Sequence, residues 1–166
     1  MSLPHYFSSV FTGENFLLFT KSITIASMGI ATGAGLSYNA MIMPALAKFA
    51  PSSSSLAVWC ETAFPAMSIQ VSAIAVSVLG GSYIYYKTKN RFFLYSSLIM
   101  ASILPYTAAF FLPINGPLFE MNKTGRDDGT IGKKMAQWNR NQYGRVGLNA
   151  LALFVSLFGI LHVKAA

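Results

Sequence analysis

The stretch FFLYSSLIMASILPYTAAFFLPINGPLF, residues 92–119, decides the fold because it contains no Asp, Glu, Lys or Arg. Three other runs also lack charged residues: 22–47, 62–86 and 146–163. A helix needs about 20 apolar residues to cross the ~30 Å hydrocarbon layer of a bilayer. In lipid, each backbone N–H and C=O must be paired within the spanning segment, which favours helices. The sequence therefore predicts four transmembrane helices.

The composition supports the same fold class. Hydrophobic residues make up 54% of the 166 residues and charged residues only 10%, whereas a soluble domain has about 25% charged residues. Lipid must therefore cover much of the surface, although a soluble helical bundle is the alternative. We predict an all-α fold, a single integral membrane domain over residues 1–166. The four transmembrane helices are expected near 20–43, 66–86, 92–112 and 143–163, with a long loop between helices three and four.

The charge distribution indicates a membrane partner. The net charge of +7 lies mostly where the predicted loops meet the membrane, which lipid headgroups explain better than nucleic acid does. Trp59 in the first loop is interpreted as an interfacial anchor. The first residues lack the features of a cleaved signal peptide or a mitochondrial presequence. We therefore expect an uncleaved signal anchor in the endoplasmic reticulum membrane, with a mitochondrial membrane as the alternative; orientation and homo-oligomerisation stay open.

Cysteine and histidine are too sparse to indicate a metal or redox site. Cys60 is the only cysteine, and the two histidines, His5 and His162, are far apart in the sequence. The chain therefore has no CxxC motif and no intramolecular disulfide. We expect no metal and no bound cofactor.

The end of the third predicted helix is unusual because Asn115 lies between two prolines, Pro113 and Pro117. Pro105, within the helix, is expected to kink it, because proline removes a backbone hydrogen bond and crowds the preceding turn. Pro113 and Pro117 are expected to end it. The break would then leave unpaired carbonyls and the Asn115 side chain facing a cavity.

The start of the fourth predicted helix has four polar or aromatic residues at helical spacing: Trp138, Gln142, Arg145 and Asn149. At about 100° per residue they share one face. Facing lipid, Arg145 and Asn149 would be costly, so this face is expected to point inward. It would meet Asn39 and Asn115, at the ends of helices one and three. The convergence predicts a small-molecule pocket at the membrane surface. In the structural alternative, Arg145 snorkels to the headgroups and Trp138 anchors the interface.

Some of these residues also produce a family resemblance. They are Pro105-Tyr106-Thr107, Pro113-Ile114-Asn115, and Trp138 followed by Arg145. Together with four hydrophobic helices, they make the chain resemble the anthrone oxygenase family (DUF1772), whose characterised members act in aromatic polyketide pathways. The resemblance spans most of the chain. Where many relatives are expected to have a histidine, four residues after the tryptophan, this chain has Gln142.

The resemblance implies oxidation of an anthrone at its central methylene to an anthraquinone, with molecular oxygen as co-substrate and neither metal nor flavin. The implied catalytic residues are Arg145, for the phenolate or enolate oxygen, and the neutral donors Asn115 and Gln142. The implied residues for binding the aromatic substrate are Trp138, Tyr106, Asn149 and Asn39. The general base stays open among Glu61, Asp127 or Asp128 in a closing lid, water and hydroxide.

A second function from a different class also fits the sequence. The chain is then a non-enzymatic accessory subunit of a larger membrane complex, or a lipid or quinone binder. Small residues on the first helix, including the GxxxG pair Gly29 and Gly33, suit packing against another subunit. A channel or transporter is disfavoured, because the chain has neither repeated halves nor a charged pore ring.

Overall fold

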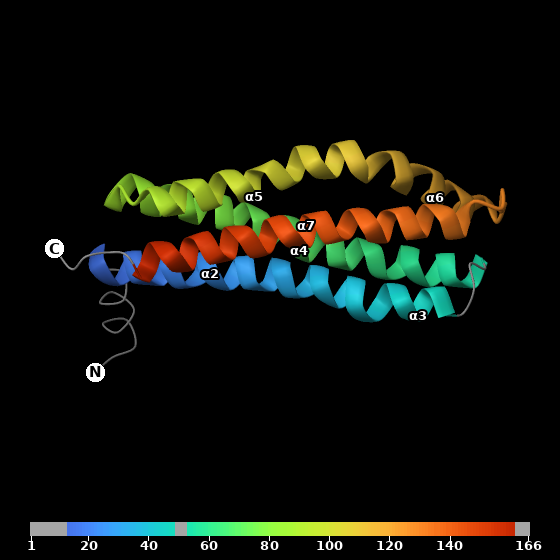
Figure 1. Cartoon of the computed structure of the whole chain (residues 1–166), viewed down its shortest axis with the longest axis horizontal. Coiled ribbons are helices and arrows are strands. Elements are labelled where there is room, and N and C mark those ends of the chain that lie inside the picture. The colour runs from blue at the N-terminus through green and yellow to red at the C-terminus, as the bar shows by residue number, and fades with distance from the viewer. Residues whose placement is uncertain (1–12, 49–52, 162–166) are drawn as a thin grey trace, which may run out of the picture.

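The computed structural model describes residues 13–48 and 53–161, and every regular element in this part of the chain is a helix. The elements are α2 (Gly13–Ser37), the π-helix η1 (Tyr38–Ile42), α3 (Met43–Lys48), α4 (Ser53–Thr88), α5 (Arg91–Phe110), α6 (Leu112–Thr124) and α7 (Ile131–Leu161) (Figure 1). Four helical segments are long and apolar enough to cross a membrane: Gly13–Lys48, Ser54–Thr88, Arg91–Phe110 and Ile131–Leu161. The predicted all-α integral membrane fold is confirmed. Residues 162–163, predicted to end the fourth helix, and both histidines lie outside the described residues.

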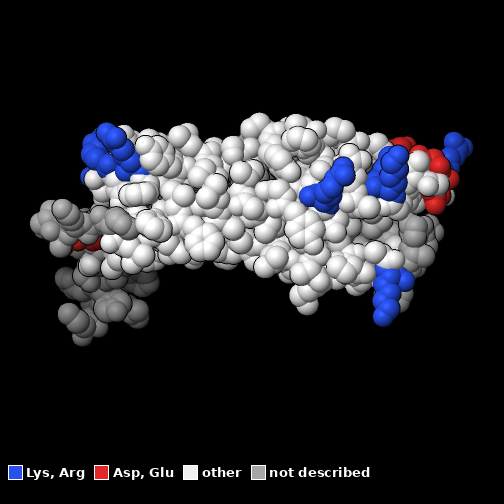
Figure 2. Space-filling view, viewed as in Figure 1, with Lys and Arg blue, Asp and Glu red and all other residues white. Residues whose placement is uncertain are grey.

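The long helices form a ring of four. α2 packs against α4 and α7, and α5 packs against the same two helices from the other side. All of them run along the long axis of the molecule, and α3, α6 and the connection between α6 and α7 lie at one end of it (Figure 1). We call this the α3/α6 end. Charged side chains gather toward the two ends of this axis (Figure 2).

The helices extend well beyond the predicted boundaries. α4 begins at Ser53 rather than near 66, with Pro65 inside it, and α7 begins at Ile131 rather than near 143. The long loop between helices three and four is not confirmed, because α6 occupies much of that segment and only residues 125–130 connect it to α7. The absence of charge marks only the part of a helix inside hydrocarbon, so polar turns outside the membrane were missed.

A count along the helices locates the membrane boundary. Lys87 of α4 and Arg91 of α5 mark one face of the membrane. A helix crosses the hydrocarbon layer in about 20 residues, so the opposite face lies near Met67, counted back along α4, and near Phe111, counted forward along α5. The α3/α6 end therefore projects beyond the hydrocarbon layer. This explains why helical turns there tolerate polar and charged residues.

The predicted break around Asn115 is much shorter than expected. α5 continues through Pro105, and the helix is interrupted only at Phe111, after which α6 begins and changes direction (Figure 1). The Asn115 N–H donates to the Phe111 carbonyl at 2.8 Å. Pro113 lies in the first turn of α6, where a missing N–H costs no helical bond. The prediction that a proline break ends the third helix is therefore confirmed at Pro113, just before which α5 ends, and is wrong for Pro117, which lies inside α6.

The π-helix η1 turns two neighbouring residues into the bundle. The Met43 N–H donates to the Tyr38 carbonyl, five residues back. Pro44 has no N–H to offer the carbonyl four residues before it, which favours the wider turn here. The extra residue places both Tyr38 and Asn39 in the interior, where both are buried. Such π-bulges frequently occur at functional sites.

α2 and α7 approach most closely at a glycine that differs from the predicted pair. A Cβ built at Gly35 would lie 2.7 Å from Cγ2 of Val146 and 3.3 Å from Nε2 of Gln142. A Cβ at Gly29 or Gly33 would meet nothing within 4 Å among the described atoms. The GxxxG pair therefore makes no tight helix contact within residues 13–48 and 53–161.

We expect Gly35→Ala to destabilise the protein by about 1–3 kcal/mol, because the added methyl overpacks the α2–α7 contact. Gly33→Ala, two residues away on the same helix, is the control. It is expected to leave the midpoint of thermal unfolding unchanged or to raise it, because alanine favours helix over glycine. Equal midpoints for the two variants in detergent would contradict the close approach at Gly35.

Candidate functional site

A layer of polar side chains lies between two apolar clusters in the bundle interior. One cluster, toward the α3/α6 end, includes Trp138 of α7, and the other includes Ala152 of the same helix. The buried polar residues between these clusters are Gln70 of α4 and Gln142, Arg145 and Asn149 of α7. On α4, Ala63 and Ala73 of the two clusters bracket Gln70 in the same way. We call these four residues the polar layer.

The polar face predicted for the fourth helix does point inward. The Arg145 side chain is only 8% exposed and that of Gln142 is fully buried. Trp138 and Asn149 are also buried, with exposed fractions of 5% and 1%. The alternative in which Arg145 snorkels to the headgroups is therefore wrong. The 3.6-residue period was sufficient to identify this face, because one helix continues without interruption from Ile131 to Leu161.

Arg145 has an aromatic neighbour but no counter-charge. Its Cζ lies 4.4 Å from the centroid of the Phe111 ring, which is within cation–π range. In the described part of the chain, no carboxylate forms an ion pair with it, and its Nε has no hydrogen-bond partner. An uncompensated charge inside a membrane bundle is costly. The arrangement is therefore suited to an anionic or oxygen-bearing ligand.

Unpaired polar atoms gather around the same residue. Among the described residues, no partner is found for the two amide atoms of Gln142, for Oε1 of Gln70, or for Oδ1 of Asn149 and Asn115. Buried side-chain polar atoms in native proteins are mostly hydrogen-bonded, so each exception needs a reason. Five such atoms on four neighbouring amides indicate a site rather than a packing defect.

A small cavity of about 30 Å³ lies beside the polar layer. Residues from α4, η1, α5–α6 and α7 contribute to its wall, among them Tyr38, Trp59, Gln70, Asn115, Trp138 and Arg145. A cavity of this size accommodates about one water-sized molecule. It can hold dioxygen but not a polycyclic aromatic substrate.

Aromatic rings close the cavity toward the α3/α6 end. The Trp138 ring lies 5.4 Å from Tyr38, 5.6 Å from Trp59 and 5.4 Å from Phe111, centroid to centroid. Trp59 is fully buried, so its interpretation as an interfacial anchor is wrong. The error follows from the early start of α4, which makes Trp59 part of a helix that faces Trp138. The Tyr38 hydroxyl bonds to Oγ1 of Thr62 at 2.7 Å.

Five of the seven predicted site residues form two groups. Arg145, Trp138 and Asn115 line the cavity, whereas Gln142 and Asn149 are buried in the polar layer and are not among its lining residues.

Asn39 and Tyr106 make contacts elsewhere. The Asn39 amide nitrogen donates to Oδ1 of Asn139 at 2.6 Å and to its carbonyl at 3.0 Å, which ties η1 to α7. The Tyr106 hydroxyl donates to the Asn141 carbonyl at 2.9 Å, and its ring packs on Phe110. In this arrangement both residues join helices, and their contribution to substrate binding stays a prediction.

Sequence reasoning missed Gln70, which reaches both the polar layer and the cavity wall. It is the only amide side chain in the charge-free run 62–86. An amide at membrane depth needs a partner or a cavity, and the same rule that singled out Asn39 would have identified it.

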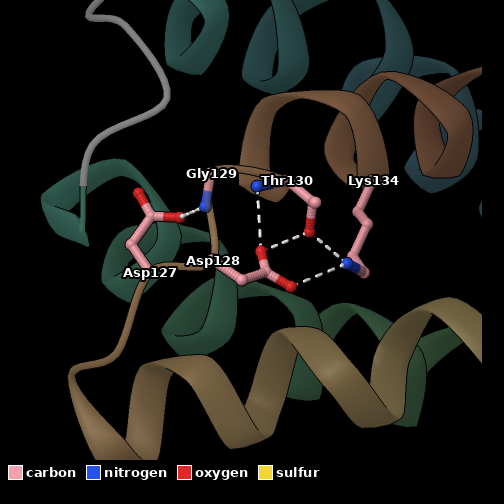
Figure 3. A network of polar contacts seen from close by, with 5 residues as sticks. All are labelled: Asp127, Asp128, Gly129, Thr130 and Lys134. Atoms are coloured by element: carbon pink, nitrogen blue, oxygen red, sulfur yellow. Dashed lines mark hydrogen bonds and ion pairs between the residues drawn. The ribbon is translucent and has the colours of Figure 1, made fainter.

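The carboxylates considered as a general base all lie away from the cavity. Glu61 is exposed on α4. Asp127 accepts the Gly129 N–H at 2.7 Å and Asp128 accepts the Thr130 N–H at 2.9 Å (Figure 3). Asp128 also accepts from the Thr130 hydroxyl and pairs with Lys134 at 3.4 Å. The two aspartates therefore stabilise the turn just before α7, and neither lines the cavity.

The hydrogen bonds from Thr130, side chain first and then backbone, hold the pKa of Asp128 below its ordinary value. Within residues 13–48 and 53–161, no three His, Cys, Asp or Glu side chains are placed to share a metal ion. The residues that line the cavity carry amides, hydroxyls, indole N–H groups and one guanidinium.

Comparison with known proteins identifies a family. The family model described as anthrone oxygenase matches residues 57–155, which include Gln70, Asn115, Trp138 and Arg145. No curated protein and no solved structure matches the chain.

We expect Asp128→Ala to lower the midpoint of thermal unfolding without altering the polar layer. A carboxyl whose folded pKa is depressed stabilises the fold above its unfolded pKa of about 3.9, and this stabilisation disappears as the pH falls through the folded pKa. The difference from the wild-type midpoint should therefore be largest near neutral pH and shrink below about pH 4. A difference that stays constant down to pH 3 would contradict a stabilising role of the Asp128 charge in this turn.

Gln142→Met tests whether the unpaired amide is a functional feature. Replacing a buried unpaired polar group by an apolar one of similar size removes a desolvation penalty of about 1–3 kcal/mol. We therefore expect Gln142→Met to have a higher midpoint of thermal unfolding and a lower rate of anthrone oxidation than the wild type. Gln137→Met, at an exposed position on the same helix, should change neither quantity. A lower midpoint for Gln142→Met would mean that the amide has a stabilising partner.

Proposed function

We propose that this chain, which belongs to the anthrone oxygenase family, oxidises an anthrone-type polycyclic aromatic to an anthraquinone with molecular oxygen, without metal or flavin. The observation that supports this best is the buried Arg145 guanidinium, which has no carboxylate partner among the described residues. Such a group stabilises negative charge on a substrate oxygen in a low-dielectric environment.

The substrate itself supplies the reactivity. Its central methylene lies between two aryl rings and opposite a carbonyl, so loss of one proton gives a delocalised enolate. The enolate passes one electron to dioxygen, and the resulting carbon radical and superoxide combine to a peroxide on the same carbon. Loss of the remaining C–H proton with cleavage of the O–O bond leaves a carbonyl. In sum, one CH₂ and one O₂ give one C=O and one H₂O.

Arg145 is the central catalytic residue in this proposal, because the charge that develops on the enolate oxygen would lie beside its guanidinium. Asn115 lines the same cavity and is proposed as a neutral donor. Gln142, buried in the polar layer one turn before Arg145, is proposed as a second neutral donor. Trp138 offers an apolar ring face on the cavity wall. The 30 Å³ cavity suits dioxygen, held next to the reacting carbon.

Proton removal is assigned to water or hydroxide. Glu61, Asp127 and Asp128 do not line the cavity, and anthrones oxidise slowly in air without any enzyme. A guanidinium that stabilises the enolate lowers the barrier to proton loss, so a weak base suffices.

Arg145→Met is expected to lower kcat/KM for anthrone oxidation about 10²- to 10³-fold, the usual cost of losing one preorganised donor to a developing oxyanion. Arg145→Lys should keep part of the activity because it keeps the charge but not the planar donor fork. Arg140→Met is the control, since Arg140 is exposed on the same helix.

The measurement is anthraquinone formation by purified protein under air with a chelator, compared with buffer alone. Full activity of Arg145→Met would contradict the assignment of Arg145 to the site. Loss of activity in both Arg145→Met and Arg140→Met would indicate a general electrostatic effect instead. No acceleration by folded wild-type protein would remove the oxygenase proposal itself.

A second candidate function is that of a non-enzymatic subunit or binding protein. It is favoured by Gly29 and Gly33, where an added Cβ meets no described atom within 4 Å, so a partner helix has room to approach. Inactive but folded protein that copurifies with a second membrane protein would support this alternative.

A further inference from the structure

A groove of about 190 Å³ opens on the outside of the bundle between α4 and α5. Val71 and Leu104 in its wall are about half exposed, and Ala108 is exposed as well. Met67 and Phe111 mark the membrane boundary, so the residues from 70 to 74 and from 104 to 108 lie inside the hydrocarbon layer. The mouth of the groove therefore faces lipid chains rather than water.

The floor of this groove is polar. Gln70, 3% exposed, and Arg145, 8% exposed, are both among its lining residues. Oε1 of Gln70 and Nε of Arg145 have no hydrogen-bond partner in the described part of the chain. A lipid acyl chain offers nothing to these atoms. A flat apolar molecule with a hydroxyl at one edge suits both the apolar walls and the polar floor, because the hydroxyl can donate to Oε1 of Gln70 and its oxygen can accept from Nε of Arg145.

The groove adjoins the inner cavity. Met67, Gln70, Thr107 and Arg145 line both spaces, so these four side chains form the partition between them. A larger groove of about 650 Å³ lies between α3 and α4, with Ala45 and Val58 in its wall. It shares no lining residue with the cavity, and the hydrogen bond between Tyr38 and Thr62 lies between the two.

We propose that the substrate enters sideways from the bilayer and binds in the α4–α5 groove. Its oxygen-bearing edge lies on Arg145 and Gln70, and its reacting carbon faces the inner cavity through the partition of Met67 and Thr107. Gln70 is thereby a substrate-positioning residue. The identity of the ligand as an anthrone rests on the proposed function, whereas the lateral route and the binding groove do not.

The chain contains its own reporter of binding. Trp59 and Trp138 are its two tryptophans, and both line the inner cavity. A quinone bound across the partition would therefore quench the whole tryptophan emission. The test uses 1,8-dihydroxyanthraquinone, a stable analogue of the product, titrated into protein reconstituted in phosphatidylcholine nanodiscs.

Ala108→Phe fills the α4–α5 groove, and Ala45→Phe makes the same change in the α3–α4 groove. Both alanines are exposed, so each phenylalanine extends from the surface without crowding the core. We expect Ala108→Phe to weaken quinone binding and raise KM at least about tenfold, and Ala45→Phe to change neither. Thermal unfolding confirms folding, and Ala108→Leu is the milder replacement if Ala108→Phe does not fold.

The outcomes separate this proposal from the proposed function. Quinone binding that Ala108→Phe abolishes and Ala45→Phe preserves supports the groove, even if wild-type protein oxidises no anthrone. Binding lost in Ala45→Phe alone, in both variants or in neither overturns the groove assignment. Anthrone oxidation with an unchanged KM in Ala108→Phe would leave the oxygenase in place and remove the lateral route.

Discussion

Arg145 introduces a positive charge into a bundle in which the other buried polar side chains of the described residues are neutral. Neither an ion pair nor a hydrogen bond to its Nε compensates the charge among the described residues, although its Cζ lies 4.4 Å from the centroid of the Phe111 ring. A bundle selected for stability alone would have an apolar residue here, because replacing a buried charge by an apolar side chain is often stabilising. The cost is understandable if a ligand brings the missing negative charge.

The surrounding packing holds this charge in place. α2 must approach α7 closely so that the polar layer is enclosed, and Gly35 permits this at the level of Gln142. The π-turn at Tyr38–Ile42 then directs Tyr38 toward Trp138 and Asn39 toward Asn139 of α7. Above and below the layer, the two apolar clusters seal the interior. Each of these features limits the movement of α7, and therefore of the guanidinium.

The sequence predicted the parts that depend on periodicity and missed those that depend on neighbouring helices. The inward face of α7 followed from the spacing of Trp138, Gln142, Arg145 and Asn149 within one helix. The burial of Trp59 could not be predicted in this way, because it depends on where α4 begins and which helix it faces. The helix ends were misplaced for a different reason. Polar turns outside the bilayer look like loops in hydropathy, yet continue as helix because their backbone bonds form regardless of the surrounding solvent.

The separation of the carboxylates from Arg145 follows from the same electrostatics. A carboxylate in contact with the guanidinium would form an ion pair and neutralise the charge that an enolate needs, so a strong acid–base residue inside this small site would weaken the stabilisation it is meant to assist. Placing the guanidinium at the edge of the hydrocarbon layer resolves the conflict. The low dielectric there strengthens its attraction for a developing oxyanion, and in the proposed reaction the lipid side would admit the apolar reactants. A buried cationic side chain in a membrane protein can thus favour the loss of a proton from a substrate without a strong base, provided that the substrate is already acidic and reactive toward oxygen.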